Sequence, residues 1–355
     1  MDLAPALARF LPELRELDTD EPLAPCAHCV MAPVSGEAEV GGGRVRFTAP
    51  ARCCTYHPQL ANVLAGAALR EGGPGAAAIH ARLSTLDGVD SLGIGPPAAA
   101  ARRYAQRSAE AFGRDASLTC PFWVRGPLGC SIHPHRNAIC RTWSCRRTHG
   151  ERGARAAEAI KHLVYDLEAR IAAAAAQAMA RHLPTEQATG ADWARYFVAC
   201  ADWCDGLDDD AFHGPRRDAL LAQVTRAVAR RDRPLPSCPT PALRAWTHHA
   251  DRVELQSWSP YDPVDAPPWI FELLARLDGL TPWPQAVADA EAALGHPVPA
   301  DLVAWLWWRG CLAEPEDDEG ETIEVLPAGS RGGVASADPT GGPRSLASPR
   351  DPPIE

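Results

Sequence analysis

The chain has 355 residues, of which 46% are hydrophobic, and a formal net charge of −10. This length allows two or three domains with hydrophobic cores, and 12 cysteines are too sparse for a small disulfide-rich scaffold. The negative charge argues against a nucleic-acid-binding protein, and no stretch approaches the roughly 18 apolar residues that a membrane-spanning helix needs. The first residues also lack the pattern of a secretory signal, so we expect a cytoplasmic protein with no membrane or nucleic-acid partner.

The first 150 residues have the features of a loop-rich domain with short helices, and we take 1–150 as the first domain. Apolar residues recur at helical spacing over 1–20, and alternating residues around a Gly-rich turn predict a hairpin at 36–49. A helix is predicted over 57–72, where a Gly-Gly-Pro sequence ends it, and a second helix is predicted around 98–112.

Helical patterns dominate the next segment, 151–232, which we expect to extend the first domain and pack on it. The predicted helices cover 151–182, 191–204 and 215–232. The second of these carries residues at three-to-four spacing that predict a buried stripe: Trp193, Tyr196, Phe197, Cys200 and Cys204.

The C-terminal third predicts a linker, a small domain and a tail. The proline-rich segment 233–242 is typical of a linker, and 243–313 predicts a small helical or winged-helix-like domain built as helix, turn, helix, turn, helix. Within it, Trp305 and Trp308 lie one turn apart, which favours a core position for both. Residues 314–355 are acidic and then rich in Pro, Gly and Ser, which predicts disorder.

Eight cysteines in two tight groups are the strongest functional signal. Closely spaced thiols form either disulfides or metal sites, and the expected cytoplasmic location favours reduced thiols that bind metal. A Cys-x-x-Cys pair is the usual two-ligand turn, and four cysteines complete one tetrahedral zinc site or hold one 4Fe–4S cluster. The predicted ligands are Cys26, Cys29, Cys53, Cys54, Cys120, Cys130, Cys140 and Cys145.

The second group resembles the zinc- or iron-chelating cysteine-cluster family of the CxxCxxCC type. The stretch CSIHPHRNAICRTWSC at 130–145 is similar to the later half of the family pattern, CSIYxxRPxxCRxFxC. The earlier half is matched by Cys26, Cys29, Cys53 and Cys54, with Cys120 as the bridging member. The chain departs from the pattern by the insertion 30–52 and by His133 and Arg136-Asn137 in place of Tyr and Arg-Pro.

The resemblance implies a metal cofactor, either an iron–sulfur cluster (4Fe–4S) or zinc. The family includes proteins similar to flagellin lysine-N-methylase, so the resemblance also implies a peptide- or protein-modifying activity as one candidate. The sequence has no Gly-rich loop that would bind S-adenosylmethionine; GIGPP at 93–97 is too short and is broken by proline. No nucleophile–base pair or paired carboxylate stands out in the sequence, so any catalysis would rest on the metal.

Five histidines lie within a few residues of a cluster cysteine and are candidate accessory ligands or proton carriers: His28, His57, His133, His135 and His149. Arginines also crowd the last cysteine, where they would receive an anionic substrate or balance the thiolates: Arg141, Arg146, Arg147, Arg152 and Arg155. A solvated surface is the simpler interpretation of each single histidine.

The predicted fold class is mainly α, at most α+β, with a loop-rich, metal-stabilised N-terminal region and a small helical or winged-helix-like C-terminal domain. Three functions remain open at this point. The chain is a metalloenzyme that modifies a peptide or protein bound by the C-terminal domain, a non-catalytic metal chelator or redox sensor, or a zinc scaffold for a protein-interaction module.

Overall fold

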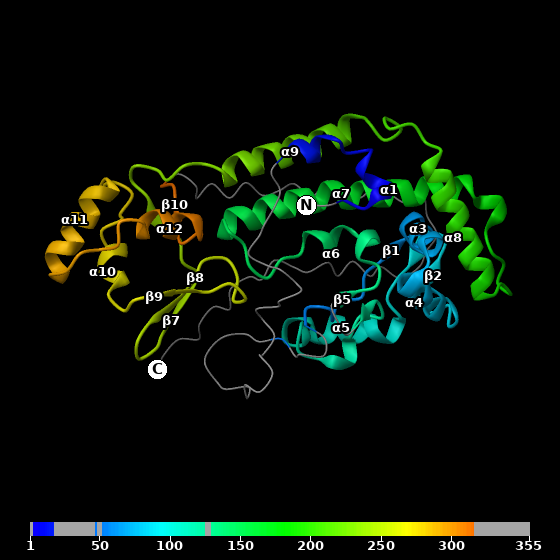
Figure 1. Cartoon of the computed structure of the whole chain (residues 1–355), viewed down its shortest axis with the longest axis horizontal. Helices are drawn as coiled ribbons and strands as arrows, with labels where there is room; N and C mark the ends of the chain where they lie inside the picture. The colour runs from blue at the N-terminus through cyan, green and yellow to red at the C-terminus, as the bar shows by residue number, and fades with distance from the viewer. Residues whose placement is uncertain (1–2, 18–46, 48–51, 125–128, 316–355) are drawn as a thin grey trace, which may run out of the picture. The chain divides into compact units, whose positions relative to one another are not determined.

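A computed structural model of the chain describes residues 3–17, 47, 52–124 and 129–315 (Figure 1). Contacts divide the chain into two units, Met1–Glu316 and Asp317–Glu355, and all described residues belong to the first. The predicted hairpin at 36–49, apart from residue 47, and the predicted tail beyond residue 315 lie outside the described residues.

The described residues form twelve α-helices and ten short strands, which confirms a mainly α fold with small sheets. The helices are α1 (Pro5–Ala8), α2 (Glu13–Glu16), α3 (Asn62–Glu71), α4 (Gly73–Leu83), α5 (Ala98–Ala111), α6 (Ala138–Thr142), α7 (Gly150–Ala178), α8 (Gly190–Asp205), α9 (Pro215–Arg231), α10 (Ile270–Leu274), α11 (Trp283–Leu294) and α12 (Leu302–Trp308). Three 3-10 turns join them: η2 (Ala116–Leu118), η3 (His133–His135) and η4 (Ala180–His182). Among the described helices, none is long and apolar enough to cross a bilayer.

The strands form four small antiparallel sheets, with the orders β1-β3-β2, β4-β5, β10-β6 and β7-β8-β9. Their bounds are β1 (Leu60–Ala61), β2 (Val89–Asp90), β3 (Gly93–Ile94), β4 (Trp123–Val124), β5 (Gly129–Cys130), β6 (Thr240–Pro241), β7 (Ala245–His248), β8 (Val253–Gln256), β9 (Val264–Ala266) and β10 (Leu312–Ala313). The register of the largest sheet places Trp246 opposite Leu255, and Leu255 opposite Val264.

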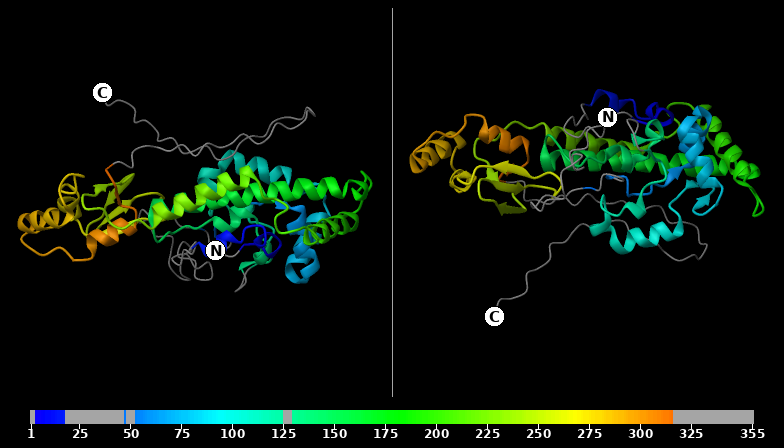
Figure 2. Two further views of the ribbon diagram at one scale, coloured as in Figure 1. Left: turned by 90° about the horizontal axis from the view of Figure 1, so that it is seen from above. Right: turned by 60° about the horizontal axis from the view of Figure 1, so that its bottom comes forward.

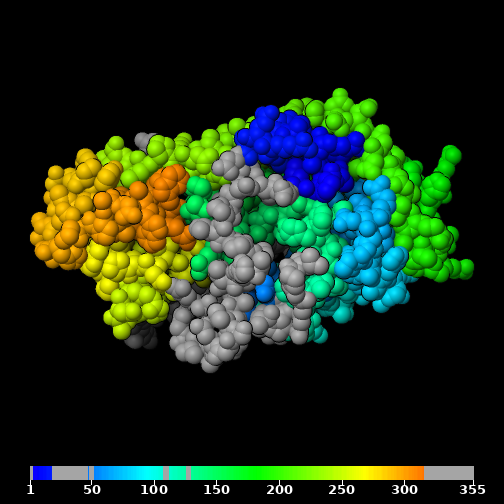
Figure 3. Space-filling model, in the orientation of Figure 1, coloured from blue at the N-terminus to red at the C-terminus, as the bar shows by residue number. Residues whose placement is uncertain are grey.

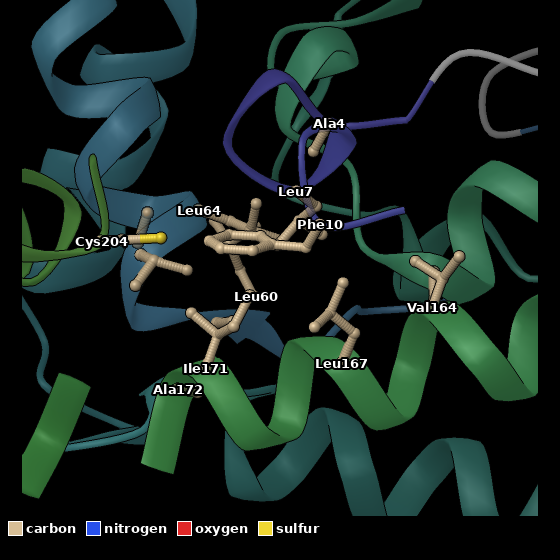
Figure 4. Close-up of a cluster of buried hydrophobic side chains, with 14 of the residues drawn as sticks. Ala4, Leu7, Phe10, Leu60, Leu64, Val164, Leu167, Ile171, Ala172 and Cys204 are labelled. Atoms are coloured by element: carbon tan, nitrogen blue, oxygen red, sulfur yellow. The ribbon is translucent and has the colours of Figure 1, made fainter. Parts of the chain in front are cut away.

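The long helix α7 organises the first of two hydrophobic cores. Apolar residues recur every three or four positions along it, and Leu163, Leu167 and Ile171 are almost fully buried. Figure 4 shows side chains of α3 and of the N-terminal segment meeting this face of α7. Helix α9 lies alongside α7 (Figures 1 and 2), and its Val224 and Val228 belong to the same core.

Helices α3 and α8 approach so closely that only glycine fits at their crossing. A Cβ atom on Gly66 would lie 1.9 Å from the carbonyl oxygen of Phe197. Helix α8 begins at a capping box, in which Thr189 and Asp192 satisfy each other's backbone N–H groups. The predicted stripe on α8 is confirmed, because Tyr196, Phe197 and both of its cysteines are buried.

The N-terminal segment is fixed to the surface of this core rather than forming the single helix predicted over 1–20. It forms α1 and α2 with a break between them, because Pro12 interrupts the helical run. Arg9 donates to the carbonyl of Leu207 at 2.7 Å, and Arg217 contacts both carboxylate oxygens of Glu13 at 2.6 Å. In the space-filling view this segment, in blue, lies against the helices coloured green (Figure 3).

The second core lies in residues 253–312 and combines the β7-β8-β9 sheet with α10, α11 and α12. The three helices confirm the helix–turn–helix–turn–helix prediction, whereas the three-stranded sheet before them was missed. The prediction for the tryptophans of α12 is wrong, since Trp305 and Trp308 are 38% and 39% exposed while Trp307 is 1% exposed. Trp307 belongs to this core, together with Val303 and Leu306 of the same helix.

Candidate metal centre

Backbone contacts bring the first described cysteine pair to the second cysteine group. Cys53 and Cys54 lie in the turn before β1, and Cys120 follows η2. The N–H of Cys120 donates to the carbonyl of Cys54 at 2.7 Å, so residues more than sixty positions apart in sequence are hydrogen-bonded. His57 holds the same turn, with its Nε2 atom 3.1 Å from the carbonyl of Leu118.

The later cysteines are presented by a short hairpin and a short helix. Cys130 ends β5, opposite Trp123 of β4. Cys140 lies in α6, where the side chain of Asn137 caps the helix by accepting the N–H of Cys140 at 3.0 Å. Cys145 is half-buried in the segment between α6 and α7.

Five thiols form one group, in which the ionisation of each is linked to that of at least one other: Cys53, Cys54, Cys120, Cys130 and Cys140. Burial raises the pKa of Cys120 to about 12, and the Cys140 and Cys130 thiols add to that rise. Burial likewise raises the pKa of Cys140 to about 12, with Cys130 and Cys53 contributing. A hydrogen bond with the Cys54 thiol, followed by burial, raises the pKa of Cys53 well above its ordinary value. Without added positive charge, the thiols of Cys53, Cys120 and Cys140 therefore stay protonated at neutral pH.

The chemistry of these donors fits a soft metal. Several thiols that repel one another as thiolates ionise together only when a cation is present, and thiolates select zinc and iron–sulfur clusters over hard cations. Arg136 supplies part of that positive charge. Its guanidinium opposes, but does not cancel, the rise in the pKa of Cys53 and Cys140. The arrangement is not that of a closed site, since no three His, Cys, Asp or Glu side chains of the described ranges are grouped to hold a metal ion. Cys26, Cys29 and His28 lie outside those ranges.

The four described candidate histidines occupy four different environments. His57 is held by the Leu118 carbonyl, and burial lowers its pKa. His135 is buried and its Nε2 lies 2.5 Å from a carboxylate oxygen of Glu71. His133 is exposed in η3, and the ring of His149 packs edge-on against Trp308 with centroids 4.9 Å apart.

The arginines predicted to surround the last cysteine are held by nearby backbone or by the second core. Arg141 is buried and donates to the Arg136 carbonyl at 2.7 Å. Arg147 donates to the Thr142 carbonyl at 2.7 Å through its side chain, and Arg152 packs over the indole of Trp307 with its guanidinium carbon 3.4 Å from the ring centroid.

A buried carboxyl beside the thiols was missed at the sequence level. Glu168 of α7 is 5% exposed, and its Oε1 atom is buried with no hydrogen-bond partner among the described residues. Burial raises its pKa to about 8, and it acts electrostatically on Cys140 and on Tyr56. Burial and the Cys140 thiol also raise the pKa of Tyr56. The available signal was the position of Glu168 on the apolar face of α7, between Leu167 and Ile171.

The segment that follows Cys145 is bonded directly to the second core. Asp262 is 1% exposed and accepts the backbone N–H of Arg147 at 2.9 Å, the indole N–H of Trp258 at 3.0 Å and the guanidinium of Arg309. Arg309 in turn donates to the carbonyl of Arg147 at 2.7 Å. The segment that follows Cys145 is therefore joined to the second core by hydrogen bonds at Arg147.

Comparison of the chain with family models, with curated proteins and with solved structures gave no match.

Proposed function

We propose that the chain is a metal-binding protein whose clustered cysteines hold an iron–sulfur cluster or zinc. The observation that carries the proposal is the gathering of Cys53, Cys54, Cys120, Cys130 and Cys140 from separate stretches of chain into one group whose ionisations are linked. A protein without metal gains little from gathering five thiols in a loop-rich region. A thiolate-bound metal, by contrast, gives that arrangement a large stabilisation.

The described cysteines would supply most of the ligands. The thiolates would come from Cys53, Cys54, Cys120, Cys130 and Cys140, with Cys145, Cys26 and Cys29 as further donors. Bound metal supplies positive charge that the thiolates need and a covalent junction between the loops, and structural zinc contributes roughly 10–16 kcal/mol in small peptides. Arg136 would balance part of the remaining negative charge. A cytoplasmic location would keep these thiols reduced.

A peptide or protein partner is the second part of the proposal. The segment that leaves the cluster is hydrogen-bonded to the second core through Asp262, so a partner held there would lie near the cysteine-bearing domain. Whether the metal acts chemically on that partner depends on an open coordination position. The two alternative functions, a structural scaffold and a modifying enzyme, thus require the same metal site and the same partner.

The ligand assignment is tested by two matched cysteine substitutions. Cys140→Ser is expected to lose metal, because it removes a thiol from the cluster. Cys200→Ser is the control: like Cys140 its thiol has a pKa raised by burial, here to about 11, but it packs in the α8 stripe. Metal per folded chain is measured by elemental analysis after anaerobic purification, with folding checked by circular dichroism.

The expected result is a large loss of metal in Cys140→Ser and wild-type metal content in Cys200→Ser. Equal metal content in the two folded variants would overturn the assignment of the cluster. Cys130→Ser, from the hairpin, provides a second member of the cluster if Cys140→Ser does not fold.

A further inference from the structure

A pocket of about 440 Å³ lies where the start of α7 meets the end of α12, lined by Thr148, His149, Trp305, Trp308 and Arg309. Figure 1 shows these two helix ends next to each other. This hollow is open to solvent rather than enclosed, which suits a segment of a larger partner better than a small ligand. Trp305 and Trp308 are more than one-third exposed although they are large apolar side chains, and they face the pocket while Trp307 fills the core behind them.

The walls of the pocket are fixed by short-range packing and buried hydrogen bonds. The ring of His149 packs edge-on against Trp308, and Arg309 is held by the Arg147 carbonyl and the buried Asp262 carboxylate. The backbones meet closely, because a Cβ atom on Gly150 would lie 2.2 Å from the carbonyl oxygen of Arg309. A pocket built this way is preformed, which lowers the entropic cost of binding.

Two exposed arginines lie near the start of α7, whose first residue packs against Arg309 of the pocket. Arg155 and Arg244 both pair with Glu151 of the first turn, at 3.1 and 3.2 Å, and their side chains are 57% and 63% exposed. The other two arginines of 147–155 contribute less, because Arg147 is buried and Arg152 packs over Trp307. One carboxylate shared by two exposed guanidinium groups leaves a net positive charge for a ligand to neutralise.

We propose that this pocket binds an acidic peptide segment of a partner protein, with an aromatic side chain inserted between Trp305, Trp308 and His149. Carboxylates on either side of the inserted ring would face Arg155 and Arg244. Stacked and edge-on aromatic contacts suit a planar apolar group, and surface tryptophans are frequent anchors in protein interfaces. The inference rests on the partner in the proposed function and is independent of the metal.

A single-stranded nucleic acid would also combine stacking with negative charge. The formal net charge of −10 opposes a long polyanion, whereas a short acidic peptide would meet only Arg155 and Arg244. A peptide is therefore the occupant that the charges favour.

The test uses the full-length chain and a fluorescein-labelled heptapeptide with a central Phe flanked by Asp and Glu. Fluorescence anisotropy is expected to show saturable binding below 1 mM that weakens as salt is raised from low to physiological strength and beyond. Two matched peptides, one with a central Ala and one with Lys flanks, are expected to bind at least about tenfold more weakly. Absence of saturable binding by the Phe peptide, or equal binding by the Lys-flanked peptide, would overturn the proposal.

Two variants locate the binding site. Trp308→Ala is expected to weaken binding about 30-fold, a typical loss for an aromatic anchor, and Trp305→Ala serves if the first variant does not fold. Trp246→Ala is the matched control, since this indole is 55% exposed on β7 and outside the pocket. Unchanged binding in the pocket variants would overturn the proposal. So would stronger competition by poly(U), or a dimer in sedimentation analysis that Trp308→Ala disrupts.

Metal content is measured on the same preparations so that the two proposals fail separately. A metal-free chain that binds the peptide overturns metal binding alone. A metal-loaded chain that shows no peptide binding overturns the pocket assignment alone.

Discussion

Substitution of Glu168 tests whether this carboxyl, which acts electrostatically on Cys140, is a buried neutral acid in the folded chain. The carboxyl is buried on α7, accepts the backbone N–H of Ala138 and has a pKa raised by burial to about 8. Replacing it with Gln keeps the shape and the accepting oxygen but removes the ionisable group. The substitution therefore isolates the cost of ionising a buried acid.

The magnitude follows from the two pKa values. The unfolded chain ionises Glu168 near 4.5 and the folded chain near 8, so between these pH values the unfolded state releases a proton that the folded state keeps. The free energy of unfolding of the wild type consequently falls as pH rises, by about 1.4 kcal/mol per pH unit from this group. The stabilising effect of the neutral acid is fully present below pH 4.5 and is lost as pH rises through 8, a total of about 5 kcal/mol.

Glu168→Gln is expected to remove that dependence. Relative to wild type, the variant should gain about 4 kcal/mol of stability between pH 5 and pH 9. Urea unfolding followed by circular dichroism at the two pH values measures the difference, with a chelator present because bound metal adds its own pH dependence.

Glu158→Gln is the matched control on the same helix. Burial acts to raise the pKa of Glu158, but hydrogen bonds from His162 and Lys161 prevail and lower it to about 2, so this group stabilises the fold above pH 4.5. Its replacement should give no gain at high pH. If the difference between Glu168→Gln and wild type is the same at both pH values, Glu168 is not a buried neutral acid and the reasoning fails.

Two further substitutions probe the close contacts that hold the fold. Gly66→Ala should destabilise the chain by about 3 kcal/mol in urea unfolding, because its Cβ would lie 1.9 Å from the Phe197 carbonyl oxygen; a wild-type midpoint would show that α3 and α8 do not cross so closely. Asp262→Ala should lower the free energy of unfolding by about 3–5 kcal/mol, since it leaves the Arg309 guanidinium and the Trp258 N–H without their shared buried acceptor. A loss below about 1 kcal/mol would show that Asp262 does not hold these donors.

The helices of the first core were predictable because several sequence signals agreed for each of them. In α7 an Ala-rich composition coincides with an apolar stripe, and the structure confirms a helix over Gly150–Ala178 followed by η4. In α8 the aromatic and cysteine residues share one face, and α9 begins at Pro215 as a favoured first position. Helix α3 begins later than predicted, because Leu60 and Ala61 pair with β3.

The errors arose where tertiary contacts override local pattern. The strands of the β7-β8-β9 sheet are at most four residues long, too short for a reliable alternation signal. Trp305 and Trp308 share a helical face, but that face borders the pocket, and Trp307 takes the core position through its indole N–H bond to the Arg233 carbonyl at 3.1 Å. Sequence spacing identified the two faces of α12 and could not say which one is covered.

The candidate site was predictable in residue type but not in arrangement. Short spacing and thiol chemistry pointed to the cysteines. Their spacing could not predict the backbone hydrogen bond that brings Cys120 to Cys54. Glu168 joins the thiols only through folding, because α7 is distant from Cys53 and Cys54 in sequence and carries no cysteine. Whether the C-terminal domain is winged-helix-like stays a prediction.

The most direct test of metal binding is the composition of the anaerobically purified full-length chain. Iron, zinc and acid-labile sulfide are quantified per chain, and the visible absorption spectrum is recorded. Our account predicts at least one metal site per chain, either as iron with sulfide and visible absorption or as zinc in a colourless protein. A folded chain with its thiols reduced and neither metal present would contradict it.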